Sequence, residues 1–385
     1  MDGVTRMRKE EFERELCGNI LPYWMKHAID REGGGLYGEI DSRNVVRRDA
    51  PKSAVLCARV LWVFSRAYSV FGDRAYWRTA RHAYRHLTGA FWDAQYGGVY
   101  TSLNREGAAV SQDKELFSQA FALYAISEFS RATGSAEARE LALSLFAQIE
   151  QKTADQAYGG YFETMQRDWT PIAQAKTANA HMHLLEAYTN LLTVWTDDRV
   201  RKQLHALTCL MVERAIRGDG HMTLRFDRTW VSTSEEIQFG QDIENGWLMY
   251  AGAKAAGDDA LVRKTHNAML ALATAIYGLD EGTGIPYGCS PGEPADKDRC
   301  WWVQAEAVVG YFTAWRISGD ERFYAAADRV WAYIQAYIVD RKYGEWHCRV
   351  SEDGIPRTDR PKVSAWKCPY HNARMCFVMM EALAI

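Results

Sequence analysis

Five side chains that can carry charge or move protons stand at helical spacing inside otherwise apolar segments. A charge among apolar neighbours either belongs to a buried ion pair or lines a cavity, because burying an isolated charge is costly. Arginine, carboxylates and histidines that share one cavity suit acid–base chemistry on a polar, uncharged molecule. For each residue alone, an ion pair or a hydrogen-bonded core histidine is the simpler interpretation. The five residues are Arg59, His183, Glu244, Glu306 and His371.

Further polar and aromatic side chains lie about one helical turn from these residues. Gln241 shares a helix face with Glu244, and Asn179 shares one with His183. Trp302 begins the helix that carries the second glutamate. Tryptophan rings suit the C–H face of a sugar, and the polar groups suit its hydroxyls. The residues therefore indicate a sugar-processing enzyme or a sugar-binding protein.

The elements that must position these residues repeat along the chain. Glycine–aromatic segments such as YGGVYTS (96–102) and YGGYFET (158–164) recur at intervals of 60 to 64 residues. A period of this length fits two helices and a substantial loop. The marker glycines of the six segments are Gly35, Gly98, Gly160, Gly220, Gly284 and Gly344.

Helical periodicity between the markers predicts helices that alternate in character. Segment 74–90 carries a solvated arginine stripe, whereas its partner 53–71 is apolar nearly all round. Six inner and six outer helices in alternation predict an all-α (α/α)6 barrel with short strands or loops at one end. The five chemistry-bearing residues all fall on inner helices. The predicted helices are 8–28, 53–71, 74–90, 114–133, 136–152, 175–194, 198–216, 241–257, 259–277, 302–318, 320–338 and 369–384.

The length of 385 residues alone would suggest two or three domains. No linker interrupts the repeat, so we expect a single domain over 1–385. The net charge of −3 argues against nucleic acid or an anionic membrane as partner. The charged amino terminus lacks a secretory signal, and no run approaches the roughly 18 apolar residues that a membrane helix needs.

Eight cysteines without a CxxC pair indicate neither a disulfide framework nor a zinc site. We expect a cytoplasmic protein without bound metal, a monomer or weak homodimer, whose partner is a small-molecule carbohydrate.

Long motifs resemble those of a known family. The strings are ILPYWMKHAIDREGGGLYGEID (20–41), AVLCARVLWVFSRAY (54–68), WWVQAEAVVGY (301–311) and WKCPYHNARM (366–375). They are similar to the cellobiose 2-epimerase branch of the N-acylglucosamine 2-epimerase family, and the resemblance runs from about residue 8 to the end. It implies an (α/α)6 barrel, which agrees with the repeat.

The resemblance also implies a reaction, the reversible epimerisation at C2 of a reducing-end sugar in a cellobiose- or mannobiose-type disaccharide. The ring opens, a base removes the C2 proton, an enediolate forms and a proton returns to the opposite face. No metal or organic cofactor is needed, because the aldehyde already acidifies C2. Two histidines near neutral pKa exchange the protons.

Residue by residue, Arg59 matches the arginine that stabilises the enediolate. His371 matches the catalytic histidine of WKCPYHN, and Glu244 the carboxylate that orients a catalytic histidine. His183 matches the histidine of the third inner helix. The resemblance adds a set of substrate contacts, which are Trp302, Trp366, Asn179, Glu306 and Phe117. At position 117 the family commonly has tyrosine.

Position 241 departs from the family pattern. The family segment reads GHDIE, and this chain reads GQDIE, so Gln241 replaces the first catalytic histidine. A carboxamide forms hydrogen bonds but holds no proton at neutral pH. The chain is then an engineered variant, a homologue in which His371 alone gives slow epimerisation or aldose–ketose isomerisation, or a sugar binder without catalysis. A glycoside hydrolase is a further alternative, with Glu244 and Glu306 as its two carboxylates.

Overall fold

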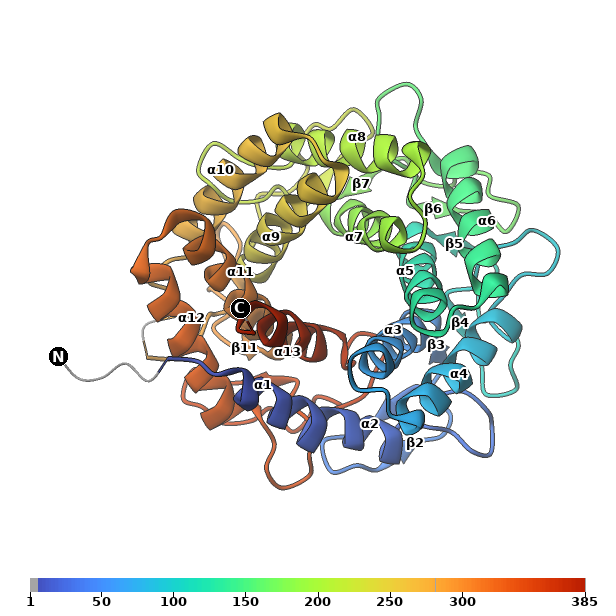
Figure 1. Cartoon of the computed structure of the whole chain (residues 1–385), viewed down its shortest axis with the longest axis horizontal. Helices are drawn as coiled ribbons and strands as arrows, with labels where there is room; N and C mark the ends of the chain where they lie inside the picture. The colour runs from blue at the N-terminus through green and yellow to red at the C-terminus, as the bar shows by residue number, and fades with distance from the viewer. Residues whose placement is uncertain (1–5, 281, 385) are drawn as a thin grey trace.

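The chain forms a ring of helices in two layers (Figure 1). The computed structural model describes residues 6–280 and 282–384. Each inner helix contacts the next along the chain, and the last contacts the first, which closes the inner ring. The inner helices are α3 (Ala54–Phe71), α5 (Leu116–Thr133), α7 (Ala178–Val194), α9 (Phe239–Ala256), α11 (Trp301–Ser318) and α13 (Tyr370–Ala382).

The outer layer consists of six helical segments that alternate in sequence with the inner helices (Figure 1). Two of these segments contain a π-helical turn. The first outer segment comprises α1 (Lys9–Glu15), the π-turn η1 (Leu16–Ile20) and α2 (Leu21–His27), and the sixth comprises α12 (Glu321–Tyr333) and the π-turn η2 (Ile334–Ile338). The others are α4 (Arg74–Gly89), α6 (Ala136–Thr153), α8 (Asp198–Arg214) and α10 (Asp259–Ala275). The predicted (α/α)6 barrel is confirmed.

Two-residue strands lie at the end of the barrel where the inner helices begin. After the hairpin β1–β2, the strand before an inner helix pairs antiparallel with the strand after the following outer helix. A bridge between Ile40 and Val363 joins the first repeat to the last. The pairs are β1 (Glu39–Ile40) with β2 (Val46–Arg47), β3 (Lys52–Ser53) with β4 (Ser102–Leu103), β5 (Lys114–Glu115) with β6 (Thr164–Met165), β7 (Lys176–Thr177) with β8 (Arg225–Phe226), β9 (Ile237–Gln238) with β10 (Gly288–Cys289), and β11 (Arg299–Cys300) with β12 (Arg349–Val350).

These strands explain where the predicted helix boundaries differ from the structure. The predictions began two helices at 114 and 175, but α5 begins at Leu116 and α7 at Ala178. The residues directly before each helix are extended because they pair with the neighbouring repeat as β5 and β7. Such pairing joins segments distant in sequence, so local periodicity does not reveal it.

The six marker glycines all adopt positive φ angles, between 65° and 87°. An L side chain at such a position is strained, and at Gly35, Gly98, Gly160 and Gly284 neighbouring side chains also leave no room for a Cβ. A Cβ on Gly160 would lie 2.5 Å from the ring of Trp230 and 2.8 Å from His181. The repeat read from the sequence is therefore a repeat of left-handed turns.

A polar side chain in the first turn of four inner helices binds the backbone beside these turns. In α9 this side chain is Asp242, which accepts from the backbone N–H of Met222. Gln119 and Gln304 each form a pair of hydrogen bonds with the peptide groups of Val99 and Ile285. His181 accepts from the backbone N–H of the residue after Gly160, at 3.0 Å.

Buried lysine–aspartate pairs connect the strand before an inner helix to the turn after the preceding outer helix. Four repeats contain the pair, and each lysine is at most 5% exposed. Such pairs hold the loops from which the inner helices start. They are Lys52–Asp30 at 2.8 Å, Lys114–Asp93 at 3.1 Å, Lys176–Asp155 at 3.0 Å and Lys362–Asp340 at 2.5 Å.

Helix α3 is long and apolar enough to cross a membrane by length and composition, with a mean hydropathy of 1.4 over 18 residues. No segment of this kind was expected from the sequence, and α3 is one by this measure. However, 72% of this segment is buried inside the protein, where α3 contacts α4, α5 and α13. Burial on both sides accounts for its composition, because such a helix has no solvent-facing side.

Candidate active site

A cavity of about 490 Å³ opens at the end of the barrel where the inner helices begin. Its volume lies within the range of small-molecule sites. Of the ten predicted site residues, Glu306 does not line the cavity. The nine that line it are Arg59, Phe117, Asn179, His183, Gln241, Glu244, Trp302, Trp366 and His371. Sequence reasoning missed other lining residues, among them Tyr287, Arg349, Arg360 and Lys367.

Equivalent helix positions supply most of the site. Asn179, Trp302 and His371 are the second residues of α7, α11 and α13. The sixth residue of an inner helix lies one turn deeper on the same face, and Arg59 and His183 occupy that position in α3 and α7. The repeated fold thus directs the first two turns of different helices into one cavity.

His371 is held by a buried carboxylate. Its Nδ1 lies 2.6 Å from Glu306 Oε1 but 3.7 Å from Glu244 Oε1. The resemblance assigned the orienting role to Glu244 and a substrate contact to Glu306, whereas the distances favour Glu306 as the partner of His371. Glu306 is 1% exposed and lies behind the imidazole, where Trp247 Nε1 also donates to its Oε2 at 3.0 Å.

Arg374 neutralises the carboxylates behind the cavity. Its Nη2 donates to Glu244 Oε1 at 2.6 Å and to Glu306 Oε1 at 2.7 Å, and its Nη1 donates to Glu186 Oε1 at 2.5 Å. This contact keeps Glu244 from pairing closely with His371. All four residues are at most 5% exposed, so they form one desolvated ionic network.

The network shifts the protonation equilibria of its members. Burial, reinforced by repulsion from Glu306, raises the pKa of Glu244 well above its usual value although Arg374 opposes the shift. Burial likewise raises the pKa of Glu306. Burial and the positive charges of Arg59 and Arg374 lower the pKa of His371 well below its usual value. The His371 imidazole is therefore neutral, as a general base must be.

His183 has a carboxylate partner of its own. Its Nδ1 lies 3.1 Å from Glu186 Oε2, which also accepts from the hydroxyl of Tyr370. Burial lowers the pKa of His183 to about 4, with Glu186 opposing and Arg59 adding to the shift. Although burial acts to raise the pKa of Glu186, Arg374 and His183 lower it to about 2.

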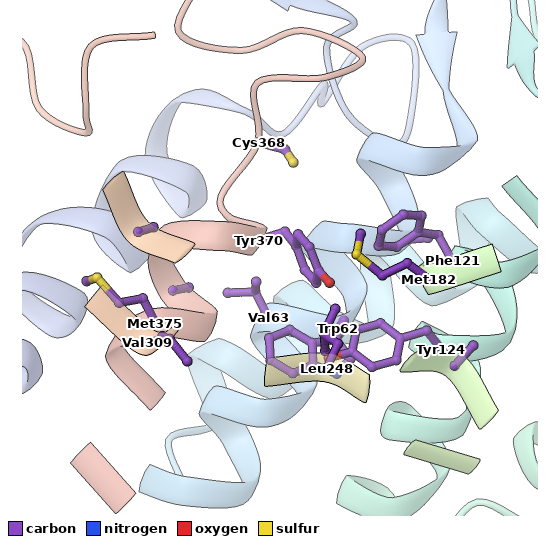
Figure 2. Close-up of a cluster of buried hydrophobic side chains, with 14 of the residues drawn as sticks. Trp62, Val63, Phe121, Tyr124, Met182, Leu248, Val309, Cys368, Tyr370 and Met375 are labelled. Carbon is purple, nitrogen blue, oxygen red and sulfur yellow. The ribbon is translucent and has the colours of Figure 1, made fainter. Parts of the chain in front are cut away.

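Arg59 lies among aromatic rings. Its guanidinium carbon is 4.2 Å from the ring centre of Phe121 and 4.7 Å from that of Tyr370. Figure 2 shows these two rings in one cluster of buried side chains, with Trp62 and Tyr124 next to them. Within residues 6–280 and 282–384, Arg59 has no carboxylate partner, and its buried Nε has no hydrogen-bond partner. Its charge is thus available to a ligand in the cavity.

Gln241 forms neutral hydrogen bonds. Its Nε2 donates to Asn179 Oδ1 at 3.1 Å, and its Oε1 accepts from Asn245 Nδ2 at 3.3 Å. Gln241 and Glu244 share a helix face, but among the described residues no hydrogen bond joins their side chains. The backbone before Gln241 is close to the aromatic wall, because a Cβ on Gly240 would lie 2.5 Å from the Trp302 ring.

Aromatic rings form two sides of the cavity. The Trp302 ring lies 5.5 Å from that of His371, so a sugar placed against it would be next to the imidazole. Phe117 lies 5.6 Å from Trp366, whose side chain is 61% exposed at the mouth. These positions agree with the predicted stacking surfaces, and Phe117 presents no hydroxyl to a ligand.

Glu244, Glu306 and His371 place their donor atoms within 4.8 Å of one another, a spacing that suits a metal ion. The guanidinium of Arg374 already lies within hydrogen-bond distance of both carboxylates. Arg374 therefore supplies the positive charge that this carboxylate pair requires.

Sequence reasoning missed three members of the network: Glu186, Arg374 and Trp247. A signal was present, since each follows a predicted site residue by three positions on the same helix face. Glu186 follows His183, and Arg374 follows His371.

The fold and the site define an (α/α)6-barrel enzyme that carries out acid–base chemistry in a cavity with aromatic walls. Comparison with known proteins makes the assignment specific. Residues 34–374 match the N-acylglucosamine 2-epimerase (GlcNAc 2-epimerase) family. The chain belongs to this family and is an isomerase of the cellobiose 2-epimerase-like branch.

Individual relatives match over nearly the full chain. The cellobiose 2-epimerase of Bacteroides fragilis is 39% identical, over 98% of this chain and 100% of its own length. That of Ruminococcus albus is 35% identical, over 96% and 97%. The solved structure of cellobiose 2-epimerase from Bacillus thermoamylovorans aligns with a TM-score of 0.91 at 35% identity, covering 97% of this chain and 99% of that one.

Proposed function

We propose that this protein interconverts the C2 epimers of a reducing-end aldose, with a β-1,4-linked disaccharide such as cellobiose as substrate. The observation that carries the proposal is the position of the His371–Glu306 pair beside a cavity that Arg59 and Trp302 also line. This arrangement combines a neutral base, a free positive charge and a stacking surface for a sugar.

The contacts support a specific role for each of these groups. Glu306 accepts from His371 Nδ1, which leaves Nε2 as the basic nitrogen of the neutral ring. After ring opening, His371 removes the proton from C2, and the electron pair moves toward O1. Arg59, which no carboxylate among the described residues neutralises, stabilises the developing oxyanion. The aldehyde acidifies C2, so the step requires no cofactor.

The geometry disfavours glycoside hydrolysis. A hydrolase needs two carboxylates on either side of the scissile bond. Arg374 Nη2 bridges Glu244 and Glu306, and Glu306 does not line the cavity. The pair therefore does not have a substrate between its members.

The test is incubation with cellobiose in deuterated water, followed by nuclear magnetic resonance and chromatography of the sugars. We expect deuterium at C2 and a disaccharide with mannose at the reducing end. His371→Asn should lower the rate by at least about 100-fold, as loss of a general base does. His266→Asn, a substitution on the outer helix α10, is the matched control and should retain the parent rate.

The products separate the alternatives. A ketose would identify aldose–ketose isomerisation, and released monosaccharides would identify a hydrolase. Calorimetric binding of cellobiose, mannobiose, lactose or mannose without C2 exchange in any of them would identify a sugar-binding protein. Each result would contradict the proposed epimerisation.

We also propose that the protein acts in the cytoplasm. All eight cysteines are free thiols, and four of them are buried. Free thiols in such number fit a reducing compartment.

A further inference from the structure

Two histidines line the same cavity, and each is paired with a carboxylate that does not line it. His371 is bound at Nδ1 by Glu306, and His183 is bound at Nδ1 by Glu186. A carboxylate at Nδ1 selects the tautomer with its proton on that nitrogen, so the lone pair of each neutral ring is on Nε2. The cavity therefore has two imidazoles whose Nε2 can take up and release a proton.

Both pairs share one source of positive charge. Arg374 contacts Glu186 through Nη1 and Glu306 through Nη2, so a single guanidinium connects the carboxylates behind the two imidazoles. The Tyr370 ring is near both imidazoles, with its centre 6.1 Å from that of His183 and 4.7 Å from that of His371.

Gln241 lacks such support. Its carboxamide bonds only to neutral groups, Asn179 and Asn245, and a carboxamide does not exchange a proton at neutral pH. Epimerisation needs one group that removes the C2 proton and a second that returns a proton to the opposite face. His371 and His183 are the two histidines among the residues that line the cavity.

We propose that His183 is the second proton carrier of this protein and performs the step that Gln241 does not support. The inference rests on the proposed epimerisation. In one direction His371 Nε2 takes the C2 proton, and the C–H electron pair forms the enediolate. His183, which takes up a proton from solvent at Nε2 before this step, then donates that proton to C2 from the other face, and the π electrons form the new C–H bond. The enzyme ends with His371 protonated and His183 neutral, and both exchange with solvent before the next turnover.

The test uses both epimers, cellobiose and its 2-epimer, in deuterated water with His183→Asn and His371→Asn. If each histidine faces one epimer, each variant exchanges the C2 proton of one epimer and not of the other, and the two variants show opposite preferences. Net epimerisation should fall by about 100-fold or more in both. A purely structural defect would lower both exchange reactions together.

Two results would overturn the assignment. One is net epimerisation by His183→Asn within tenfold of the parent rate, and the other is loss of both exchange reactions in a His183→Asn protein with parental thermal stability. If His183→Asn does not fold, Gln241→His decides: a gain of about 100-fold or more would make position 241 the missing carrier, and a gain below tenfold supports His183. If the parent exchanges no C2 proton at all, the proposed function itself fails.

Discussion

Replacing Arg374 tests whether one guanidinium holds the site together. Arg374→Met keeps a long side chain of similar shape but leaves Glu186, Glu244 and Glu306 without their shared partner. Arg374 is 3% exposed, and each carboxylate lies 2.5 to 2.7 Å from it. Breaking a buried ion pair on one side costs about 3–5 kcal/mol, because the remaining charge stays buried.

The expected shift in melting temperature follows from chain length. An unfolding entropy of about 2.1 cal/mol/K per residue gives about 0.8 kcal/mol/K for 385 residues. A loss of about 4 kcal/mol then lowers the melting temperature by about 5 °C. Arg316→Met, at an exposed site on α11, is the control and should change stability by less than about 0.5 kcal/mol.

The same variant should depend on pH in a defined direction. Burial and repulsion from neighbouring carboxylates raise the pKa values of Glu244 and Glu306, and Arg374 opposes this shift, so both values should rise further without it. A carboxyl group whose native pKa exceeds its unfolded value binds protons preferentially in the native state, so the free energy of unfolding falls as pH rises through the native pKa. The deficit against the parent, measured by calorimetry, should be larger near about pH 8 than near about pH 5.5. A melting temperature within 1 °C of the parent, or a deficit independent of pH, would refute this account of the network.

Two further predictions concern the barrel as a whole. Lys114→Met removes one of the two cations that contact buried Asp93, which keeps its bonds to Arg167 and to two backbone N–H groups, so we expect a loss of about 1–3 kcal/mol. Lys202→Met, at an exposed site on α8, should have little effect in the same denaturant titration. We also propose that the whole chain is one domain, because the inner helices form a closed ring; calorimetry should show one unfolding transition, and two resolved transitions would contradict a single domain.

Local signals explain why the fold was predictable. The apolar inner helices show the 3.6-residue period directly, and the left-handed turns require glycine at six regular positions. The predicted starts of α5 and α7 were wrong by two or three residues, because the residues before each helix pair with the next repeat in an extended conformation. Local periodicity carries no information on such pairing.

The ionic network was harder to predict, because its partners are distant in sequence. Arg374 lies 68 residues from Glu306 and 188 from Glu186. The family resemblance singled out His371 and Arg59, which line the cavity, and it named Glu244 as the carboxylate that orients a catalytic histidine. Only the three-dimensional arrangement shows that Arg374 binds Glu244 at 2.6 Å and that Glu306 is the close partner of His371.

The side chain at position 241 is not part of the ionic network around Arg374, so the chain can carry glutamine there without disturbing the buried charges. Gln241 bonds to Asn179 and Asn245, and among the described residues neither side chain forms a hydrogen bond with Arg374 or its carboxylates. A change between histidine and glutamine at 241 therefore leaves the buried charges balanced. A substitution of Arg374, by contrast, removes the positive charge that pairs with Glu186, Glu244 and Glu306. The site thus tolerates substitution where its bonds are neutral and resists it where they are ionic.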